Sequence, residues 1–326
     1  MAAKSGLGKI NIARNRKAVL NYNSIVVLGH TAAGKTALAC YLAKYLKGEI
    51  ISADSRQVYR ELNLGTGKDL NEYVVDGLKI PYHLIDIADP QEQFFVHQFA
   101  EALAKAFLEI SSRGCLPVIC GGTGLYLDVL HKDFSLTQIG ENQALRETLI
   151  NLTKEELLRR LDFYPTAHTK HVDRDSLKRI IRGIEIAEFR SKNELAPAKV
   201  KMEYRPLYLG LAFSVEDRKK RIQERLLARL EAGLVEEVES LVKKGLEHKR
   251  LQELGLEYKF VSQYIQQKIS REEMITLLQT AIVQYAKRQM TWFRKMEKEG
   301  IKIHWLNQGS PAREALQIVE SELGRV

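Results

Sequence analysis

A short stretch near the start of the chain has residue types and spacing that could hold a phosphate. Residues 27–36 read VLGHTAAGKT, which matches the pattern G-x-x-x-x-G-K-[ST]. In such a loop, backbone N–H groups and the N-terminus of the following helix point at an anion. The lysine adds positive charge beside the phosphates, and the threonine hydroxyl can bind Mg²⁺. The predicted phosphate-binding residues are Gly29, His30, Thr31, Ala32, Ala33, Gly34, Lys35 and Thr36.

Two aspartates could supply the carboxylate that phosphate chemistry usually needs. Enzymes that transfer nucleotide phosphates commonly hold Mg²⁺ with an acid at a strand end. Asp86 lies in the apolar run 83–87 and could serve, and Asp54 ends the strand-like segment 49–55. Asp54 could bind a metal, act as a general base, or be only a helix N-cap or turn residue. Position alone does not choose between these roles.

The segments around the loop have the patterns that a phosphate site needs. Residues 24–28 form an apolar run typical of a buried strand, and apolar residues recur at helical spacing from 36 to 46. A strand–loop–helix context favours a true site over a tight glycine turn with an incidental lysine. Further strand-like runs follow at 49–55, 83–87 and 116–124, with a helix at 99–114. This alternation predicts an α/β fold with a parallel, doubly wound sheet.

The alternation of strands and helices stops near Leu130. Helical patterns follow until a strand-like run returns at 205–213, and a long helix at 271–298 has an apolar stripe with Gln289 as its exception. We therefore expect a P-loop α/β core with an inserted all-helical subdomain. The predicted parts are a basic tail at 1–23, a core formed by 24–133 and 204–326, and an insertion at 134–203.

Composition narrows the class of protein. The 326 residues carry a formal net charge of +9, which favours a polyanionic partner such as nucleic acid, although charge alone does not exclude a merely basic protein. No apolar run is long enough for a transmembrane helix, so no membrane association is expected. Cys40, Cys115 and Cys120 lack metal or disulfide spacing, which indicates a reducing compartment such as the cytoplasm.

Taken together, several motifs resemble one family, the tRNA dimethylallyltransferases, also called isopentenyltransferases. The first are GHTAAGKT (29–36), ISADSRQVYRELNLGTGKDL (51–70), HLIDIADP (83–90) and VICGGTGLYL (118–127). Further agreement lies in RIIRGIEI (179–186), RIQERLLARLEAGLVEEVESL (221–241) and AKRQMTWF (286–293). The resemblance covers about residues 24–306, and the absence of a zinc finger after the core favours the bacterial type.

The resemblance implies transfer of a dimethylallyl group from dimethylallyl diphosphate to the exocyclic N6 amine of the adenine immediately 3′ of the anticodon. Charge builds on the departing diphosphate, and loop N–H groups, Lys35 and Mg²⁺ on Thr36 would stabilise it. The amine must lose a proton, and the resemblance assigns Asp54 as its base. It also assigns Arg225, in the R-I-x-x-R element, to the diphosphate.

The tRNA must present a splayed-out adenine, so its anticodon stem-loop needs several contacts. By resemblance, the target base meets Asp54, Ser55, Arg56 and Gln57, while Thr123 and Arg146 lie near the RNA. In the insertion, Lys178, Arg179 and Arg182 are predicted to share one helix face with Asp175, opposite Leu177, Ile181 and Ile184. This basic ridge suits phosphate contacts, although it could be the exposed face of a packed helix.

Three positions depart from the family pattern. His30 stands where proline is usual, and a tolerated turn substitution is favoured over a phosphate contact. GTGKD replaces GTAKP at 65–69, which predicts a more flexible loop. Leu256 lies where tyrosine is frequent, so contacts from that loop are in doubt.

Three alternatives remain beside the tRNA enzyme: an adenine-nucleotide isopentenyltransferase, a P-loop small-molecule kinase, and an RNA-binding protein with a vestigial loop. The insertion and AKRQMTWF favour tRNA over a free nucleotide. The missing acid after the fourth strand weighs against a kinase, and intact Lys35, Thr36 and Asp54 weigh against the vestigial loop. A monomer is expected.

Overall fold

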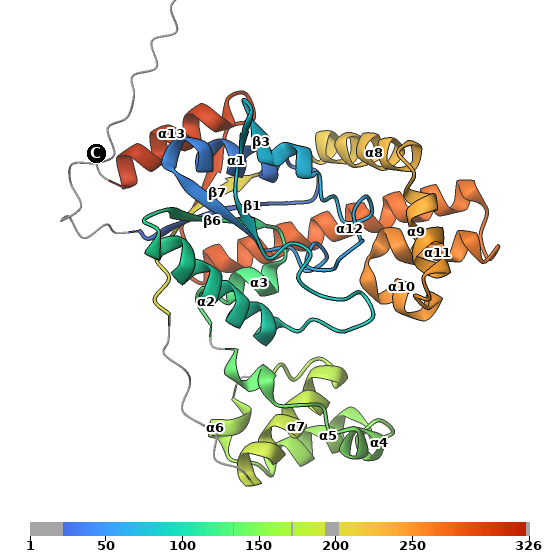
Figure 1. Ribbon diagram of the computed structural model, residues 1–326. Coiled ribbons are helices and arrows are strands. Elements are labelled where there is room, and N and C mark those ends of the chain that lie inside the picture. Colours follow the sequence, from blue (N-terminus) through green and yellow to red (C-terminus); the bar gives the residue numbers. More distant parts are fainter. Residues whose placement is uncertain (1–21, 133, 171, 193–201, 324–326) are drawn as a thin grey trace, which may run out of the picture. The chain divides into compact units, whose positions relative to one another are not determined.

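The computed structural model describes residues 22–132, 134–170, 172–192 and 202–323 (Figure 1). Nearly all of the predicted basic tail, 1–23, lies outside the described residues. Contacts within the chain separate two units. We call the first the core unit, which runs to Phe94 and includes Gln98–His131 and the chain from Tyr204 onward. The second, the insertion unit, comprises Lys132–Glu203 and also Phe95–His97, which sequence patterns had assigned to the core.

A six-stranded sheet forms the centre of the core unit, in the order β5-β2-β6-β1-β7-β8. Every neighbouring pair is parallel, which confirms the predicted α/β class. The strands are β1 Ser24–Gly29, β2 Gly48–Ser52, β5 Tyr82–His83, β6 Leu116–Gly121, β7 Pro206–Leu211 and β8 Ile303–Leu306. The central strands are apolar runs because helices cover both faces of a parallel sheet.

One predicted strand is much shorter than expected. The apolar run 83–87 contributes only its first residue to β5, because Leu84 and Asp86 have φ values of 63° and 57°. These left-handed conformations are incompatible with an extended strand. The polypeptide therefore turns away from the sheet at this point, which also moves Asp86.

Helices cover the two faces of the sheet. On one face, α1 (Lys35–Leu46) and α13 (Pro311–Glu322) share a buried apolar cluster with β1, β6 and β7. On the other side, Figure 1 shows α2 (Val96–Ser112) and α3 (Gly124–Asp128). None of the described helices is long and apolar enough to cross a membrane.

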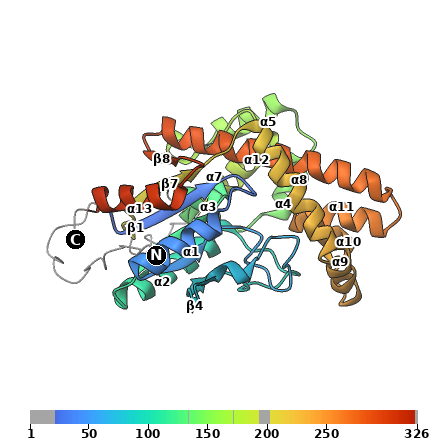
Figure 2. The same ribbon diagram turned by 90° about the horizontal axis from the view of Figure 1, so that it is seen from above.

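A helical extension follows β7. It consists of α8 (Val215–Glu231), α9 (Leu234–Lys243), α10 (His248–Leu254), α11 (Leu256–Ile265) and α12 (Arg271–Lys298). Figures 1 and 2 show α9, α10 and α11 gathered beside one end of α12. The core unit also contains the short turn η1 (Leu70–Tyr73) and a hairpin of β3 (Val74–Val75) and β4 (Leu78–Lys79).

The extension fixes the loop before η1. Tyr258, two residues after Leu256, is fully buried and donates to Glu237 Oε1 at 2.7 Å. Glu237 in turn accepts from the backbone N–H groups of Asn63, Leu64 and Gly65 at 2.8–3.2 Å. These contacts hold the start of the segment 65–69, and the flexibility predicted from GTGKD stays a prediction.

The described residues of the insertion unit after Lys132 are helical and form no strand. They comprise η2 (Ser135–Gln138), α4 (Gln143–Leu149), α5 (Lys154–Asp162), α6 (Thr166–Thr169) and α7 (Leu177–Lys192). α7 places Ile180 and Ile184 in a small apolar core, whereas the side chain of Leu177 is half-exposed. Ile181 also packs against this core, so the predicted apolar face is confirmed at Ile181 and Ile184 and wrong at Leu177. Asp175 precedes the helix rather than sharing its basic face.

Candidate active site

A cavity of about 460 Å³ opens where β1, β2 and β6 end. The glycine-rich loop forms one wall, through Thr31 to Thr36. Asp54 and Gln57 line it from the segment after β2. A further wall is formed by Thr66, Gly67, Asp69, Glu72 and Tyr73. Side chains from α8 and α12 complete it: Arg221, Glu224, Arg225, Tyr285 and Gln289. Since parallel strands end at one edge of the sheet, residues far apart in the chain meet here.

The glycine-rich loop has the backbone that its sequence predicts. Gly34, which precedes α1, has a φ of 80°, and a Cβ at Gly29 would come within 2.5 Å of the Leu211 carbonyl oxygen. Glycine is therefore required for conformation at one position and for space at the other. Lys35 Nζ donates to the His30 carbonyl at 2.9 Å, and burial lowers the pKa of its amine. Lys35 lines the cavity together with Thr31–Gly34, while the N–H groups of Thr31 and Ala33 donate to Gln289 and to the His30 carbonyl.

Arg225 joins the loop from α8. Its guanidinium donates to the Thr31 hydroxyl, and burial is the largest cause that lowers its pKa to about 10. Arg221 donates to the Ala32 carbonyl at 2.9 Å and stacks over Phe213. The structure therefore brings together Lys35, Thr36 and Arg225, which the sequence predicted for one anion site.

Asp54 follows β2 and faces the same cavity. One carboxylate oxygen accepts from the Arg56 N–H at 2.8 Å, which shapes the turn after the strand. The other makes no hydrogen bond to a described residue, so it can accept a proton from a ligand. Asp54 thus has both the turn role and the cavity position that the sequence left open.

The predicted base-contacting residues separate into two groups. Gln57 lines the cavity with Asp54, accepts from Ser52 Oγ at 2.9 Å and donates to the Gly67 carbonyl at 3.1 Å. Ser55, Arg56 and Thr123 lie outside the cavity lining, and the Ser55 N–H donates to Thr123 Oγ1 at 3.1 Å. These residues could contact only a substrate that extends beyond the cavity.

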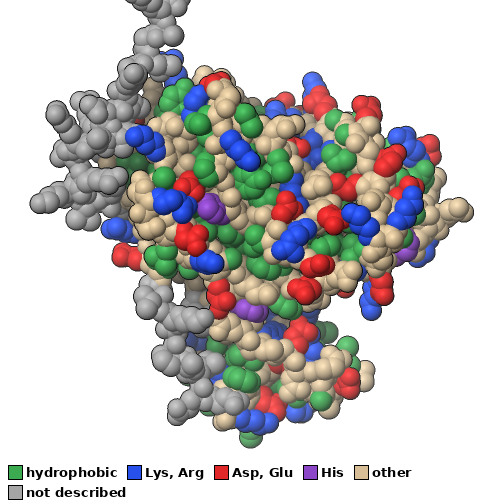
Figure 3. All heavy atoms as spheres, in the orientation of Figure 1, with side chains coloured by type: hydrophobic (Ala, Val, Ile, Leu, Met, Phe, Trp, Pro, Cys, Tyr) green, Lys and Arg blue, Asp and Glu red, His purple; other side chains and the backbone are tan. Residues whose placement is uncertain are grey.

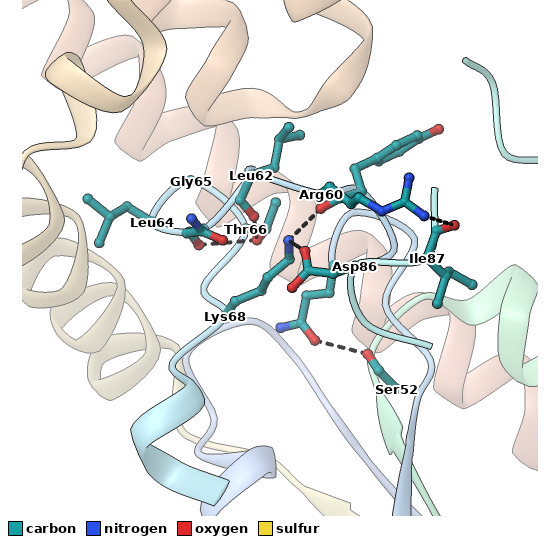
Figure 4. Close-up of polar contacts among 12 residues, drawn as sticks. Ser52, Arg60, Leu62, Leu64, Gly65, Thr66, Lys68, Asp86 and Ile87 are labelled. Atoms are coloured by element: carbon teal, nitrogen blue, oxygen red, sulfur yellow. Dashed lines mark hydrogen bonds and ion pairs between the residues drawn. The ribbon is translucent and has the colours of Figure 1, made fainter. Parts of the chain in front are cut away.

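Asp86 is not an acid of this site. Its carboxylate lies 2.5 Å from Lys68 Nζ, and the same ammonium donates to the Tyr59 carbonyl (Figure 4). Lys68 is buried, and a buried charge needs such partners. The metal role considered for Asp86 is therefore wrong, because this carboxylate is committed to Lys68 and does not line the cavity.

His30 also differs from its prediction as a phosphate-binding residue. The imidazole is buried against Phe213, its Nδ1 lies 2.6 Å from the Thr31 carbonyl oxygen, and it does not line the cavity. Nε2 has no hydrogen-bond partner among the described residues. Burial, the largest cause, lowers the pKa of His30 to about 4. His30 therefore contributes its carbonyl, which holds Lys35, rather than its ring.

This pKa predicts a dependence of stability on pH. In the unfolded chain histidine has a pKa near 6.5, so between about pH 6.5 and 4 the unfolded state binds more protons than the folded state. The free energy of unfolding therefore decreases as the pH is lowered through this window. We expect wild type to lose about 1 kcal/mol more than His30→Gln between pH 7 and 5.5, measured by urea unfolding. Equal losses in both proteins would contradict the prediction.

Sequence patterns missed an acid beside the phosphate loop. Glu72, in η1, lines the cavity and interacts with the Thr36 side chain, while burial raises the pKa of its carboxyl. It follows no strand, and this is why a search for acids at strand ends overlooked it. Its carboxylate and the Thr36 hydroxyl are oxygen donors of the type that Mg²⁺ prefers.

Gln289 has a definite role as the polar exception on α12. It accepts from the Thr31 N–H at 2.8 Å and donates to the Gly122 carbonyl at 2.9 Å, so it ties the phosphate loop to the end of β6. A buried polar residue in an apolar stripe was the available signal. The buried stripe also includes Phe293, whereas Trp292 packs on Gly124 and donates to Asp128.

Most of the predicted RNA-binding cations of the insertion unit are engaged internally. Arg146 forms ion pairs with Glu185 and Glu141, and Arg182 donates to the carbonyls of Ile139 and Gly140. Arg179, which is exposed, pairs with Asp173, and Lys178 is exposed. Arg146 and Arg182 therefore stabilise the insertion unit through contacts within it. Of the predicted basic ridge, Lys178, Arg179 and Arg182, two members already have partners in the protein.

Exposed arginines without such partners lie on α5. Arg159 and Arg160 make no ion pair or hydrogen bond within the part of the chain that the structure describes, and Phe163 beside them is 87% exposed. They precede Phe163 by four and three residues, so all three share one helix face. Figure 3 shows one face of the molecule, on which basic and acidic side chains are interspersed.

A comparison with family models finds that residues 57–296 match the model described as IPP transferase. Residues 23–84 match the model described as isopentenyl transferase. The first match alone spans well over half of the chain.

Similar proteins carry corresponding names. Over 303 residues the chain is 45% identical to tRNA dimethylallyltransferase 2 of Bacteroides fragilis, which covers 93% of this chain and 98% of the relative. It is 47% identical over 290 residues to the protein of that name from Shewanella sediminis, covering 89% and 94%. The crystal structure of tRNA isopentenylpyrophosphate transferase from Bacillus halodurans matches with a TM-score of 0.66 and 30% identity, over 92% of this chain and 97% of that one.

Proposed function

The chain belongs to the tRNA dimethylallyltransferase family, and we propose that it transfers a dimethylallyl group from dimethylallyl diphosphate to tRNA. The acceptor is the N6 amine of the adenine immediately 3′ of the anticodon. The observation that carries this proposal is one cavity in which a phosphate loop faces the carboxylate of Asp54. The relatives named for a tRNA reaction favour this function over a free-nucleotide transferase or a small-molecule kinase.

The proposed reaction uses the two sides of the cavity differently. The bond between C1 of the allyl group and the diphosphate oxygen breaks, and its electron pair leaves with the diphosphate. Loop N–H groups, Lys35 and Arg225 would stabilise that growing charge. A bond forms between C1 and N6 of adenine, and the N6 proton passes to Asp54. Gln57, beside Asp54, has an amide that could contact the base edge.

Thr36 and Glu72 fit Mg²⁺, and we propose that they help to hold it. No group of three or more metal-binding side chains occurs among the described residues. This arrangement suits Mg²⁺, which usually keeps several waters and binds through one or two carboxylates and substrate phosphates. When bound, the ion would offset the negative charge of the diphosphate.

The function is tested by supplying labelled dimethylallyl diphosphate with unmodified tRNA, AMP or ATP in separate reactions. Label should appear in tRNA and, after digestion, in the adenosine that follows the anticodon. Label in AMP or ATP but not in tRNA would replace the proposal by the free-nucleotide alternative. Release of phosphate from ATP with transfer to a small molecule would support the kinase.

We further propose that the face of α5 formed by Arg159, Arg160 and Phe163 contacts tRNA, because these arginines are not neutralised internally. Arg159→Ala with Arg160→Ala should weaken tRNA binding and reduce the slope of log K against log[salt] by about 1.5, since each phosphate contact contributes about 0.7–0.9. The measurement is a filter-binding series between low and moderate salt.

Arg179→Ala provides the control, because its partner Asp173 already neutralises this exposed arginine. We expect it to change the slope by less than about 0.5. If the double variant kept the wild-type slope, α5 would not be the RNA-binding face.

A further inference from the structure

Arg229 is a buried arginine behind the cavity that the proposed reaction does not use. It lies on α8 one turn after Arg225, and its side chain is 9% exposed. Its Nη2 makes no hydrogen bond to any described residue. Arginine is rarely buried without close partners, because a guanidinium that leaves water must replace its lost hydrogen bonds. The residue therefore calls for an explanation.

Two carboxylates lie near Arg229 but beyond hydrogen-bond distance. Asp69 Oδ2 is 3.8 Å from Nη2, and Glu257 Oε1 is 3.9 Å from Nη1. The Asp69 carboxylate is exposed and belongs to a cavity-lining residue. Burial raises the pKa of the Glu257 carboxyl, which favours its neutral form. The positive charge of Arg229 is thus only partly balanced, and it adds to the burial that lowers the pKa of Arg225.

Gly67 brings Arg229 close to the cavity wall. This glycine lines the cavity and has a φ of 68°. A Cβ there would collide with Arg229 Nη2, so the absence of a side chain lets the guanidinium lie against the backbone of the loop. Arg229 itself does not line the cavity. The backbone at Gly67, which does line the cavity, lies between it and the guanidinium.

We propose that Arg229 is a positioning residue for the donor's diphosphate: its guanidinium lies against Gly67, behind the cavity wall, and adds positive potential beside Arg225. The inference rests on the proposed function, because it takes diphosphate as the ligand of this cavity. A fixed charge that is incompletely balanced in the free protein interacts favourably with an arriving anion, without any rearrangement. This gives a function to a buried arginine that has an unused donor.

Calorimetric titration of the full chain with inorganic diphosphate and Mg²⁺ tests the inference. Arg229→Met should raise the Kd for diphosphate about tenfold, because a positive charge close to the ligand is lost. Its melting temperature should change little, because the Glu257 carboxyl that stays behind can take its neutral form, which burial already favours. Arg229→Lys, which keeps the charge, should stay within about threefold of wild type.

Lys220→Met is the matched control. It removes the same charge from an exposed position on α8, about two and a half turns away and therefore on the opposite side of the helix. Its Kd should stay within about twofold of wild type, since exposed charges are screened. If diphosphate binding were weakened equally in Lys220→Met and Arg229→Met, the effect would come from the net charge of the protein, and the inference would be overturned.

Glu257→Gln separates electrostatics from packing. It removes the carboxylate that offsets part of the positive charge of Arg229, so diphosphate binding should be unchanged or tighter. Weakening by the same factor as in Arg229→Met would show that the pair only holds the loop, and unchanged binding in Arg229→Met would likewise overturn the inference. Absence of diphosphate binding by wild type would instead refute the donor site of the proposed function.

Discussion

Asp54→Asn should lower kcat for tRNA modification by about 10²–10⁴-fold, the contribution typical of a general base. Asparagine has the same shape and can still accept the 2.8 Å hydrogen bond from the Arg56 N–H, so the turn after β2 should survive. It cannot accept a proton from the N6 amine. Single-turnover transfer to tRNA, with both substrates saturating, measures the effect on chemistry alone.

Asp69→Asn is the control for Asp54→Asn. Both residues line the cavity, and both substitutions remove one negative charge. We expect Asp69→Asn to lose less than about tenfold in kcat and both variants to bind diphosphate within about threefold of wild type. An Asp54→Asn protein that retained more than about a tenth of wild-type kcat would exclude Asp54 as the base.

Lys35→Met is expected to lower kcat/KM for dimethylallyl diphosphate by about 10³-fold. Removal of one preorganised charge-stabilising donor costs about 10²–10³ in rate, and weaker donor binding adds to this. Burial lowers the pKa of the Lys35 amine, which means that the charged amine is unfavourable in the folded protein. Replacing Lys35 with methionine should therefore not destabilise the fold. Steady-state kinetics together with thermal unfolding distinguish these effects.

Lys44→Met on the same helix is the comparison for Lys35→Met. Lys44 pairs with Asp76, an exposed carboxylate, and does not line the cavity. It should change kcat/KM by less than about twofold, since exposed ion pairs contribute little. If Lys35→Met kept the wild-type kcat/KM for dimethylallyl diphosphate, the glycine-rich loop would not be the diphosphate site.

Asp54→Asn and Lys35→Met are expected to impair different steps of the reaction. Asp54→Asn should affect the chemical step while donor binding is kept, whereas Lys35→Met should affect both. If both variants lost only tRNA affinity, the cavity would be part of the RNA-binding surface and the reacting groups would lie elsewhere.

The sequence by itself determined the parts of this protein that depend on neighbouring residues. The phosphate loop needs Gly34 at positive φ, Lys35 and Thr36 at adjacent positions, and a strand and a helix on either side. All of these lie within the continuous segment from Ser24 to Leu46. The parallel sheet followed from alternating apolar runs. The family followed from motifs spread along the chain, and the comparisons confirm it.

Local patterns failed where a single residue could adopt an unexpected backbone. The run at 83–87 has the composition of a strand, yet positive φ at Leu84 and Asp86 ends β5 after His83. The buried amine of Lys68 provides the reason for the position of Asp86, since that ammonium requires a carboxylate. The spacing of apolar residues does not indicate that Lys68 needs a carboxylate partner.

Only the tertiary structure decided which distant side chains share the cavity. Gln289 meets Thr31 across 258 positions of the chain, and Glu72 reaches Thr36 from a short turn that has no motif. Arg229 and Glu257 come from two helices that pack beside the loop at Gly67. Such pairings arise from the packing of whole elements, where burial and charge balance are settled between residues that sequence spacing does not relate.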